Sequence, residues 1–207
     1  LRFNIAIPMP ERDEEAADLF ALAMLFAAIT TGMIAIVTLS APQQVSALLG
    51  QPQLERYLWL LPAGVFFASI YSVVSLWATR KKQFATVAKT RLSQAAIGAG
   101  TQLAMGFAGI APLGLMLGHM MSSGAGFTGI AARIASQDRA AFIGMSMARM
   151  KQAFRAYDQF PKYSTFDSLA NSASVNLPVL IIAALAFDSD AGYLFLAMRV
   201  LQVPMSL

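Results

Sequence analysis

The sequence has no cysteine, a single histidine and few charged residues. The lack of cysteine excludes disulfides and thiolate metal sites, and one histidine cannot form a histidine cluster. Charged residues make up 13% of the chain, about half the share usual in globular proteins. Hydrophobic residues make up 57%, and the mean hydropathy is +0.59. This composition argues against an ordinary soluble domain and for a protein of the lipid bilayer.

The longest stretch without Asp, Glu, Lys or Arg runs for 41 residues from Leu92 to Ala132, with Pro112 and Gly114 at its midpoint. One apolar helix needs about 20 residues to cross a hydrocarbon core about 30 Å thick. The stretch therefore has the length of two membrane helices joined by a turn.

Further uncharged runs bring the number of predicted membrane helices to six. They are placed at about residues 16–39, 57–79, 93–111, 113–134, 166–187 and 191–207. The opening residues 1–7, followed by Pro8 and Pro10, are interpreted as the end of an earlier helix, so we expect the sequence to be a fragment of a longer protein. The predicted fold class is all-α, a polytopic transmembrane helical bundle.

The basic residues gather in three segments that alternate with the apolar ones. Segments 1–15, 80–91 and 133–163 hold 13 of the 15 Lys and Arg, and the connections between them hold only Arg56. The positive-inside rule places the three basic segments in the cytoplasm. The net charge of +4 therefore indicates membrane topology, and we predict no nucleic-acid partner.

Two of these basic segments carry further patterns. Glu11, Asp13, Glu14 and Glu15 stand where the first complete helix begins, and we favour helix caps over ligands for them. In the third segment Ile143, Met147, Met150, Phe154 and Tyr157 recur at spacings of 4, 3, 4 and 3. This spacing predicts an amphipathic helix on the inner leaflet, with Arg149 on another face. We favour a linker over a partner-binding motif for it.

Small and polar residues mark helix contacts inside the membrane. Gly114, Gly118, Ser122 and Gly126 form an i+4 ladder, which predicts a face for close helix approach. Gln94, Thr101, Gln102 and His119 are interpreted as interhelical hydrogen bonders, with cavity lining as the alternative for the first three and a proton relay for His119.

The last two predicted spans carry polar stripes. Asp167, Asn171, Ser174 and Pro178 follow one another at spacings of 4, 3 and 4, and Arg199, Gln202 and Ser206 at 3 and 4. Polar side chains within a bilayer normally face a bundle interior or a wet cavity. An arginine near the bilayer centre costs about 2.5 to 3.5 kcal/mol on insertion scales, so Arg199 needs a partner or a function.

Arg199 finds no counter-charge at its own depth in this sequence. It lies about 15 Å from the external turn, whereas Asp167 lies about 33 Å away. Asn176 is closer in level but cannot neutralise the charge. Arg199 therefore pairs with a carboxylate on another helix or binds an anionic substrate, and guanidinium geometry makes phosphate the leading anion.

No catalytic constellation is visible in the sequence. It has no phosphate-binding glycine loop, no paired carboxylates in an apolar span and no Ser, His and Asp grouping. We therefore expect no enzyme activity, no catalytic residues, no cofactor and no metal.

Four stretches together resemble Wzx-type oligosaccharide flippases, which handle O-antigen or exopolysaccharide units. They are LRFNIAIPMPERDEEAADLFALA, RYLWLLPAGVFFASIYSVVSLWATRKKQF, AYDQFPKYSTFDSLANSASVNLPVLIIAALAF and AGYLFLAMRVLQVPMSL. These flippases belong to the multidrug/oligosaccharidyl-lipid/polysaccharide exporter superfamily. The likeness extends over nearly the whole sequence and keeps the order of the segments.

The resemblance implies a two-lobed transporter of about 12 to 14 helices around a cationic cavity, in the bacterial cytoplasmic (inner) membrane. The sequence would run from the end of the second helix to the eighth. Residues 1–134 would belong to the N-terminal transmembrane lobe, 135–163 to a cytoplasmic amphipathic linker, and 164–207 to the start of the C-terminal lobe. The implied function is flipping of undecaprenyl-diphosphate-linked oligosaccharide for surface polysaccharide or lipopolysaccharide biosynthesis.

The resemblance also suggests which residues bind the substrate. Arg2 and Arg199 would match cavity arginines, and we expect Gln202, Asn171 and Asn176 to help bind the diphosphate and sugar while the prenyl tail stays in membrane lipid. Polysaccharide polymerase and chain-length proteins are expected partners. The alternatives are a multidrug or metabolite antiporter and a membrane scaffold that does not transport. An antiporter needs a carboxylate deep in a membrane span, whereas Asp167 lies at a shallow level.

Overall fold

The computed structural model describes residues 3–48, 52–109, 111–143, 146–185, 192–193 and 196–198. Every regular element in these ranges is a helix, which confirms the all-α prediction. The α-helices are α1 (Asp13–Ser40), α2 (Pro42–Leu48), α3 (Leu60–Arg80), α4 (Phe84–Phe107), α5 (Ala111–Gln137), α6 (Arg139–Phe142), α7 (Met147–Ala156) and α8 (Thr165–Leu185). Short 3-10 turns η1 (Phe3–Ala6) and η2 (Pro52–Tyr57) and a π-helical turn η3 (Phe160–Ser164) complete the described elements.

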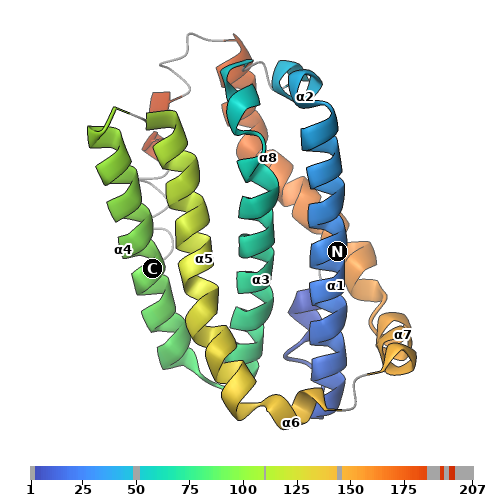
Figure 1. Cartoon of the computed structure of the whole chain (residues 1–207). Helices are drawn as coiled ribbons and strands as arrows, with labels where there is room; N and C mark the ends of the chain where they lie inside the picture. The colour runs from blue at the N-terminus through green and yellow to red at the C-terminus, as the bar shows by residue number, and fades with distance from the viewer. Residues whose placement is uncertain are drawn as a thin grey trace. The chain divides into compact units, whose positions relative to one another are not determined.

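The chain forms two compact units, Leu1–Pro161 and Lys162–Leu207. In the first unit the long helices stand side by side in the order α1, α3, α5, α4, each packed on the next (Figure 1). The short helix α6 continues from the basic end of α5 and contacts α1, and α7 also packs on α1. The second unit contains α8.

Five of the six predicted spans correspond to long helices, namely α1, α3, α4, α5 and α8. Helix α4 begins at Phe84, nine residues before its predicted start at 93. The prediction used the absence of charge as its boundary, but Lys89 and Arg91 fit readily on a helix that extends beyond the lipid. Of the sixth span, 191–207, the structure describes residues 192–193 and 196–198, and the rest lies outside the described residues.

The turn between α4 and α5 differs from the prediction. Helix α4 ends at Phe107, and Gly109 follows with φ of +75°, a backbone conformation that favours glycine. Pro112 lies in the first turn of α5, where its missing N–H costs nothing, so it starts a helix here and does not form the turn itself.

Two described helices, α1 and α3, are long and apolar enough to cross a membrane. Only 11% of the most apolar window of α1 is buried inside the protein, and Met33, Ile36 and Leu39 on this helix are each more than 60% exposed. A helix that is apolar but not covered by protein requires an apolar solvent. These two helices support a membrane protein, and the number of crossings stays a prediction.

The buried core lies toward the basic end of the first unit. Its fully buried large side chains include Phe3, Ile7, Leu19, Trp77 and Ile130. They come from η1 and its following turn, α1, α3 and α5, where η1, α6 and α7 add further layers to the long helices. The basic end thus holds most of the buried side chains of this unit, and the opposite end exposes its apolar side chains.

Helices α4 and α5 meet along the predicted small-residue ladder. A Cβ atom added to Gly114 would lie 2.6 Å from Cβ of Met105, and one added to Gly98 would lie 3.0 Å from Cβ of Ser122. The side chains of Gln102 and Gln94 cover Gly118 and Gly126 in the same way. The close-approach face is confirmed.

The polar residues of α4 do not have the predicted role. Gln94 and Gln102 fill the hollows that the α5 glycines leave, and neither they nor Thr101 forms a side-chain hydrogen bond within the described part of the chain. Among the described residues these three side chains therefore do not form the predicted interhelical hydrogen bonds. Gln102 lies nearest to Gly118 with its Cγ, whereas Gln94 lies nearest to Gly126 with its amide Nε2.

Candidate functional site

The residues predicted to bind the substrate lie mostly beyond what the structure describes. Arg2, Arg199 and Gln202 are outside the described residues, and Asn176 lies in α8 with its side chain outside them. Asn171 is exposed on α8. The anion site that these residues would form stays a prediction.

The described part of the polar stripe on α8 is open. Asp167, Asn171 and Ser174 are all exposed in their own unit, and the hydroxyl of Ser174 donates to the carbonyl of Ala170 at 2.9 Å. A polar stripe without a cover in its own unit is available to water or to another part of the protein.

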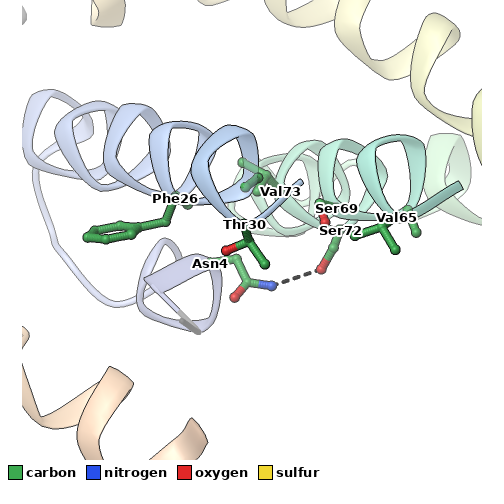
Figure 2. Close-up of a pocket in the computed structure, with 10 residues that line it drawn as sticks. Asn4, Phe26, Thr30, Val65, Ser69, Ser72 and Val73 are labelled. Atoms are coloured by element: carbon green, nitrogen blue, oxygen red, sulfur yellow. Dashed lines mark hydrogen bonds between the residues drawn. The ribbon is translucent and has the colours of Figure 1, made fainter. Parts of the chain in front are cut away.

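A pocket of about 380 Å³ lies between η1, α1 and α3 (Figure 2), and we call it the polar-lined pocket because four polar residues stand among its ten lining residues. Asn4, Thr30, Ser69 and Ser72 supply its polar groups, and the amide of Asn4 donates to Oγ of Ser72 at 2.8 Å. Thr30 and Ser69 lie near the middle of the two helices that meet the membrane-spanning criterion. Polar groups at that depth typically line a wet cavity.

Sequence reasoning missed this pocket. Ser69 and Ser72 are three residues apart and share a face of α3, which is a signal that the sequence does contain. Asn4 was assigned only to the end of an earlier helix, and its pairing with α3 bridges 68 residues of sequence. No local pattern predicts a contact of that range.

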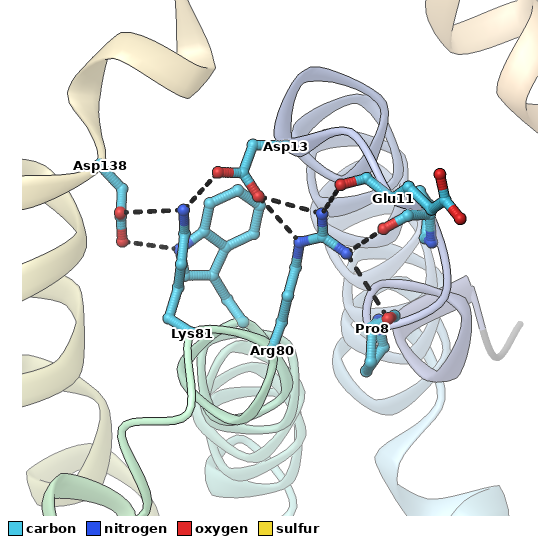
Figure 3. A network of polar contacts seen from close by, with 8 residues as sticks. Pro8, Glu11, Asp13, Arg80, Lys81 and Asp138 are labelled. Atoms are coloured by element: carbon cyan, nitrogen blue, oxygen red, sulfur yellow. Dashed lines mark hydrogen bonds and ion pairs between the residues drawn. The ribbon is translucent and has the colours of Figure 1, made fainter.

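Arg80 ties the end of α3 to the start of α1 (Figure 3). Its guanidinium donates to Oδ1 of Asp13 from Nη2 at 3.0 Å and from Nε at 3.2 Å. It also donates to the carbonyl of Glu11 at 3.1 Å and to the carbonyls of Pro8 and Pro10. With 9% of its side chain exposed, Arg80 fixes the path of the chain into α1.

Lys81 extends this network to α5. Its ammonium lies 2.5 Å from Oδ2 of Asp13 and 3.4 Å from Oδ1 of Asp138, and 5.6 Å from the ring centroid of Trp77. The indole N–H of Trp77 donates to Oδ2 of Asp138 at 2.9 Å. We call Asp13, Trp77, Arg80, Lys81 and Asp138 the basic-end clamp. It joins the start of α1, the end of α3 and the end of α5.

The backbone at the end of α3 positions these two cations. The N–H of Gln83 bonds to the carbonyl of Ala78, and that of Lys82 bonds to the carbonyl of Thr79, while Lys82 has φ of +56°. This is the Schellman geometry, which stops the helix and directs the chain away from it. Burial disfavours the charged form of Lys81, but pairing with Asp13 and Asp138 outweighs it, so the pKa of Lys81 is raised and its ammonium is charged at neutral pH.

The clamp confirms one prediction and corrects another. The basic segments 1–15, 80–91 and 133–163 meet at one end of the first unit, as the predicted topology requires. Helix α1 begins with Asp13, Glu14 and Glu15 in its first turn, where they favour the helix dipole, but its N-cap residue Arg12 makes no side-chain capping bond. These acidic residues act as partners between elements rather than as caps.

The remaining acidic residues of this turn bind α7 and the residue after it. Glu14 pairs with Arg12 at 3.2 Å and with Arg149 at 3.6 Å. Glu15 accepts a hydrogen bond from the hydroxyl of Tyr157 at 3.3 Å. Burial and the neighbouring Glu15 carboxylate raise the pKa of Tyr157, so the phenol stays a donor at neutral pH.

Helix α7 packs on α1, and only part of its predicted stripe is covered. Phe154 lies against Phe3 with ring centroids 5.4 Å apart, and Ala153 is buried. Ile143 and Met147 are more than 70% exposed. Arg149, predicted on another face, points at α1, because the acidic first turns of α1 attract it. The assignment of this helix to the leaflet surface stays a prediction.

Asp18 on α1 was missed by the sequence reasoning. Its side chain is 5% exposed, its Oδ2 lies 3.4 Å from Nε of Arg149, and its Oδ1 has no hydrogen-bond partner. A pocket of about 310 Å³ lies beside it, lined also by Glu14, Glu15 and Arg149. Asp18 falls inside the predicted span 16–39. It is therefore a second candidate, beside Asp167, for the membrane carboxylate that an antiporter needs. No group of three or more His, Cys, Asp and Glu residues in the described ranges is arranged to hold a metal ion.

His119 lines a mostly apolar pocket of about 410 Å³ between α3 and α5. Its side chain is exposed and forms no hydrogen bond with the described residues, so the predicted interhelical bond stays a prediction. The other residues that line this pocket, including Leu60 and Met116, are apolar or glycine.

The fold and the polar-lined pocket define an all-α membrane protein whose apolar helices carry polar groups at mid-depth. A family model described as polysaccharide biosynthesis protein matches residues 5–207. The chain therefore belongs to the polysaccharide biosynthesis protein family, in agreement with its resemblance to Wzx-type flippases. The comparisons with curated proteins and with solved structures found no match.

Proposed function

We propose that the protein flips polyprenyl-diphosphate-linked oligosaccharide across the bacterial cytoplasmic membrane during surface polysaccharide biosynthesis. It does so by alternating access and without enzyme chemistry. Support comes from one combined observation: a member of the polysaccharide biosynthesis family has apolar helices that hold Asn4, Thr30, Ser69 and Ser72 around an open pocket. A sugar head that crosses a bilayer needs such hydrogen-bonding groups along its path.

The proposal gives the predicted anion-binding residues distinct tasks. Arg199, with Arg2, offers guanidinium groups to the diphosphate, since this group matches phosphate with paired donors. Gln202, Asn171 and Asn176 bind sugar hydroxyls, and the prenyl tail stays in lipid. A polymerase and chain-length proteins would take the flipped product.

Substitution of Arg199 in the intact protein tests the proposal. In cells that depend on this protein, Arg199→Ala should abolish surface polysaccharide, and lipid-linked oligosaccharide should accumulate where an external, membrane-impermeant glycosidase cannot reach it. Arg199→Lys, the matched control, keeps the charge without the paired donors and should retain part of the export. Unimpaired export by Arg199→Ala at normal protein level contradicts the assignment.

Reconstitution separates flipping from the alternatives. The purified protein in vesicles should move a fluorescent lipid-linked oligosaccharide between leaflets, and filling the pocket with Ser69→Leu should slow this movement at unchanged protein level. Movement of small cationic drugs in place of the lipid-linked sugar would identify an antiporter instead. Export in cells without any movement in vesicles would identify a scaffold.

A further inference from the structure

An apolar groove of about 520 Å³ runs along the first unit between α1, α3, α5 and α6. Its walls are aliphatic and aromatic, and Arg139 is its one charged lining residue in the described part of the chain. The groove is separate from the polar-lined pocket, whose lining residues it does not share. It therefore needs an occupant of its own.

The groove runs along the helices between the basic end and the middle of the first unit. Phe127, Ala131 and Ala135 place its α5 wall over about 12 Å of helix, from nearer mid-membrane toward the basic end. At the basic end Phe20, Trp77 and Phe142 pack together, with ring centroids 4.9 to 5.7 Å apart. In the predicted topology the basic segments that meet at this end mark the level of the lipid headgroups. The groove thus runs from that level into the hydrocarbon.

Arg139 stands at the headgroup end of the groove, on the first residue of α6. It is exposed and forms no ion pair with the described residues. The adjacent carboxylate, Asp138, is already engaged by Lys81 and by the Trp77 indole. The groove accordingly offers an uncompensated cation at one end and an apolar channel leading away from it.

We propose that this groove binds one acyl chain of an anionic phospholipid whose phosphate lies against Arg139. A lipid of the leaflet at the basic end has the required layout, with negative charge at the surface and its chain pointing inward. Basic pockets between membrane helices on this side are the places where anionic headgroups bind. The bound lipid holds α6 against α1 and α3 and covers apolar walls that the protein leaves open.

Native mass spectrometry of the intact, detergent-purified protein tests this site. The probes are phosphatidylglycerol and phosphatidylcholine with identical acyl chains. The unmodified protein should retain phosphatidylglycerol preferentially. Arg139→Gln should weaken that binding about fivefold, as expected for one cation at the membrane surface. Arg155→Gln, which removes an exposed cation from α7 away from the groove, should leave it unchanged.

A second variant tests the groove without touching the charge. Ala131→Phe fills the α5 wall and should displace the lipid while Arg139 remains, which a purely electrostatic attraction would not show. A photo-crosslinker at Ala135 should capture phospholipid. Equal retention of the two lipids, unchanged binding in both groove variants, or capture of another protein segment at Ala135 would each overturn the proposal. None of these outcomes depends on whether the protein flips sugars.

Discussion

Helices α4 and α5 approach each other through glycines along most of their length, whereas α1, α3 and α5 are joined at one end by charged side chains. The faces of the first contact fit because Gly98, Gly114, Gly118 and Gly126 have no side chains, and near its basic end Arg133 also donates to Oγ1 of Thr86 at 2.9 Å. The second depends on Arg80 and its carboxylate and carbonyl acceptors. The predicted spans place the first contact within lipid and the second at the membrane surface.

Within lipid there is no hydrophobic drive between helices, so close packing of backbones must supply the attraction. At the membrane surface, water competes for ion pairs, and a pair contributes only where it is partly buried and well oriented. Arg80 meets that condition and Arg12, which is 76% exposed, does not. We therefore expect the glycine contact to behave as a fixed pair and the basic-end clamp as a contact that can be opened.

The largest expected effect comes from a bulky residue in the glycine contact. Gly118→Leu places a side chain where Gln102 and the carbonyl of Gly98 leave no room. Overpacking of this kind costs about 3 kcal/mol or more where backbone must move. Thermal unfolding in detergent should show a clear loss of stability.

Gly100 provides the matched control for this change, since nothing lies within 4 Å of a Cβ built there. Gly100→Leu on α4 should leave the unfolding temperature nearly unchanged. Equal losses for both variants would mean that leucine destabilises these helices wherever it is placed. That result would contradict the inference that the helices depend on close packing at the glycine contact.

Removal of Arg80 is expected to have the next largest effect. Arg80→Ala leaves Oδ1 of Asp13 and the carbonyls of Pro8 and Glu11 without the Arg80 donor, while Lys81 still pairs with Oδ2 of Asp13, at a cost of about 2 kcal/mol. Proteolysis after Arg12 should also become faster, because the chain entering α1 is no longer held. Arg12→Ala removes an exposed pair and should cost less than about 0.5 kcal/mol.

How far the sequence predicts the molecule depends on the range of each contact. The glycine ladder was predictable because its members are four residues apart on one helix and the packing follows from their shape. The meeting of the basic segments followed from charge counting. The pairings of Arg80 with Asp13 and of Tyr157 with Glu15 span 67 and 142 residues, and no spacing rule reaches that far.

The same limit explains the errors at the candidate site. Charge at the start of α1 predicted caps, since capping is local, but tertiary partners took these carboxylates. Asn4 and Ser72 form one pocket because η1 folds back against α3, which no local pattern specifies. Arg199 and Gln202 remain predictions of the sequence alone.

Two substitutions of Asp138 distinguish the contribution of its charge from that of its hydrogen bond within the basic-end clamp. Asp138→Asn keeps an acceptor for the Trp77 indole but removes the partial counter-charge of Lys81, and should cost about 0.5 to 1 kcal/mol. Asp138→Ala removes both and should cost more, with a change in tryptophan fluorescence. Identical stabilities for the two variants would show that only the ion pair matters.

The smallest expected effect is a gain in stability at the backbone of the clamp. Lys82 is the non-glycine residue with positive φ in the described chain, and its side chain is exposed. Lys82→Gly removes that strain and should stabilise the protein by about 0.5 kcal/mol, since glycine's greater freedom when unfolded offsets part of the gain. Lys82→Ala, the control, loses the same charge but keeps the Cβ, and should give no gain. A gain from both variants would attribute the effect to charge, whereas a gain from glycine alone assigns it to the turn that positions Arg80 and Lys81.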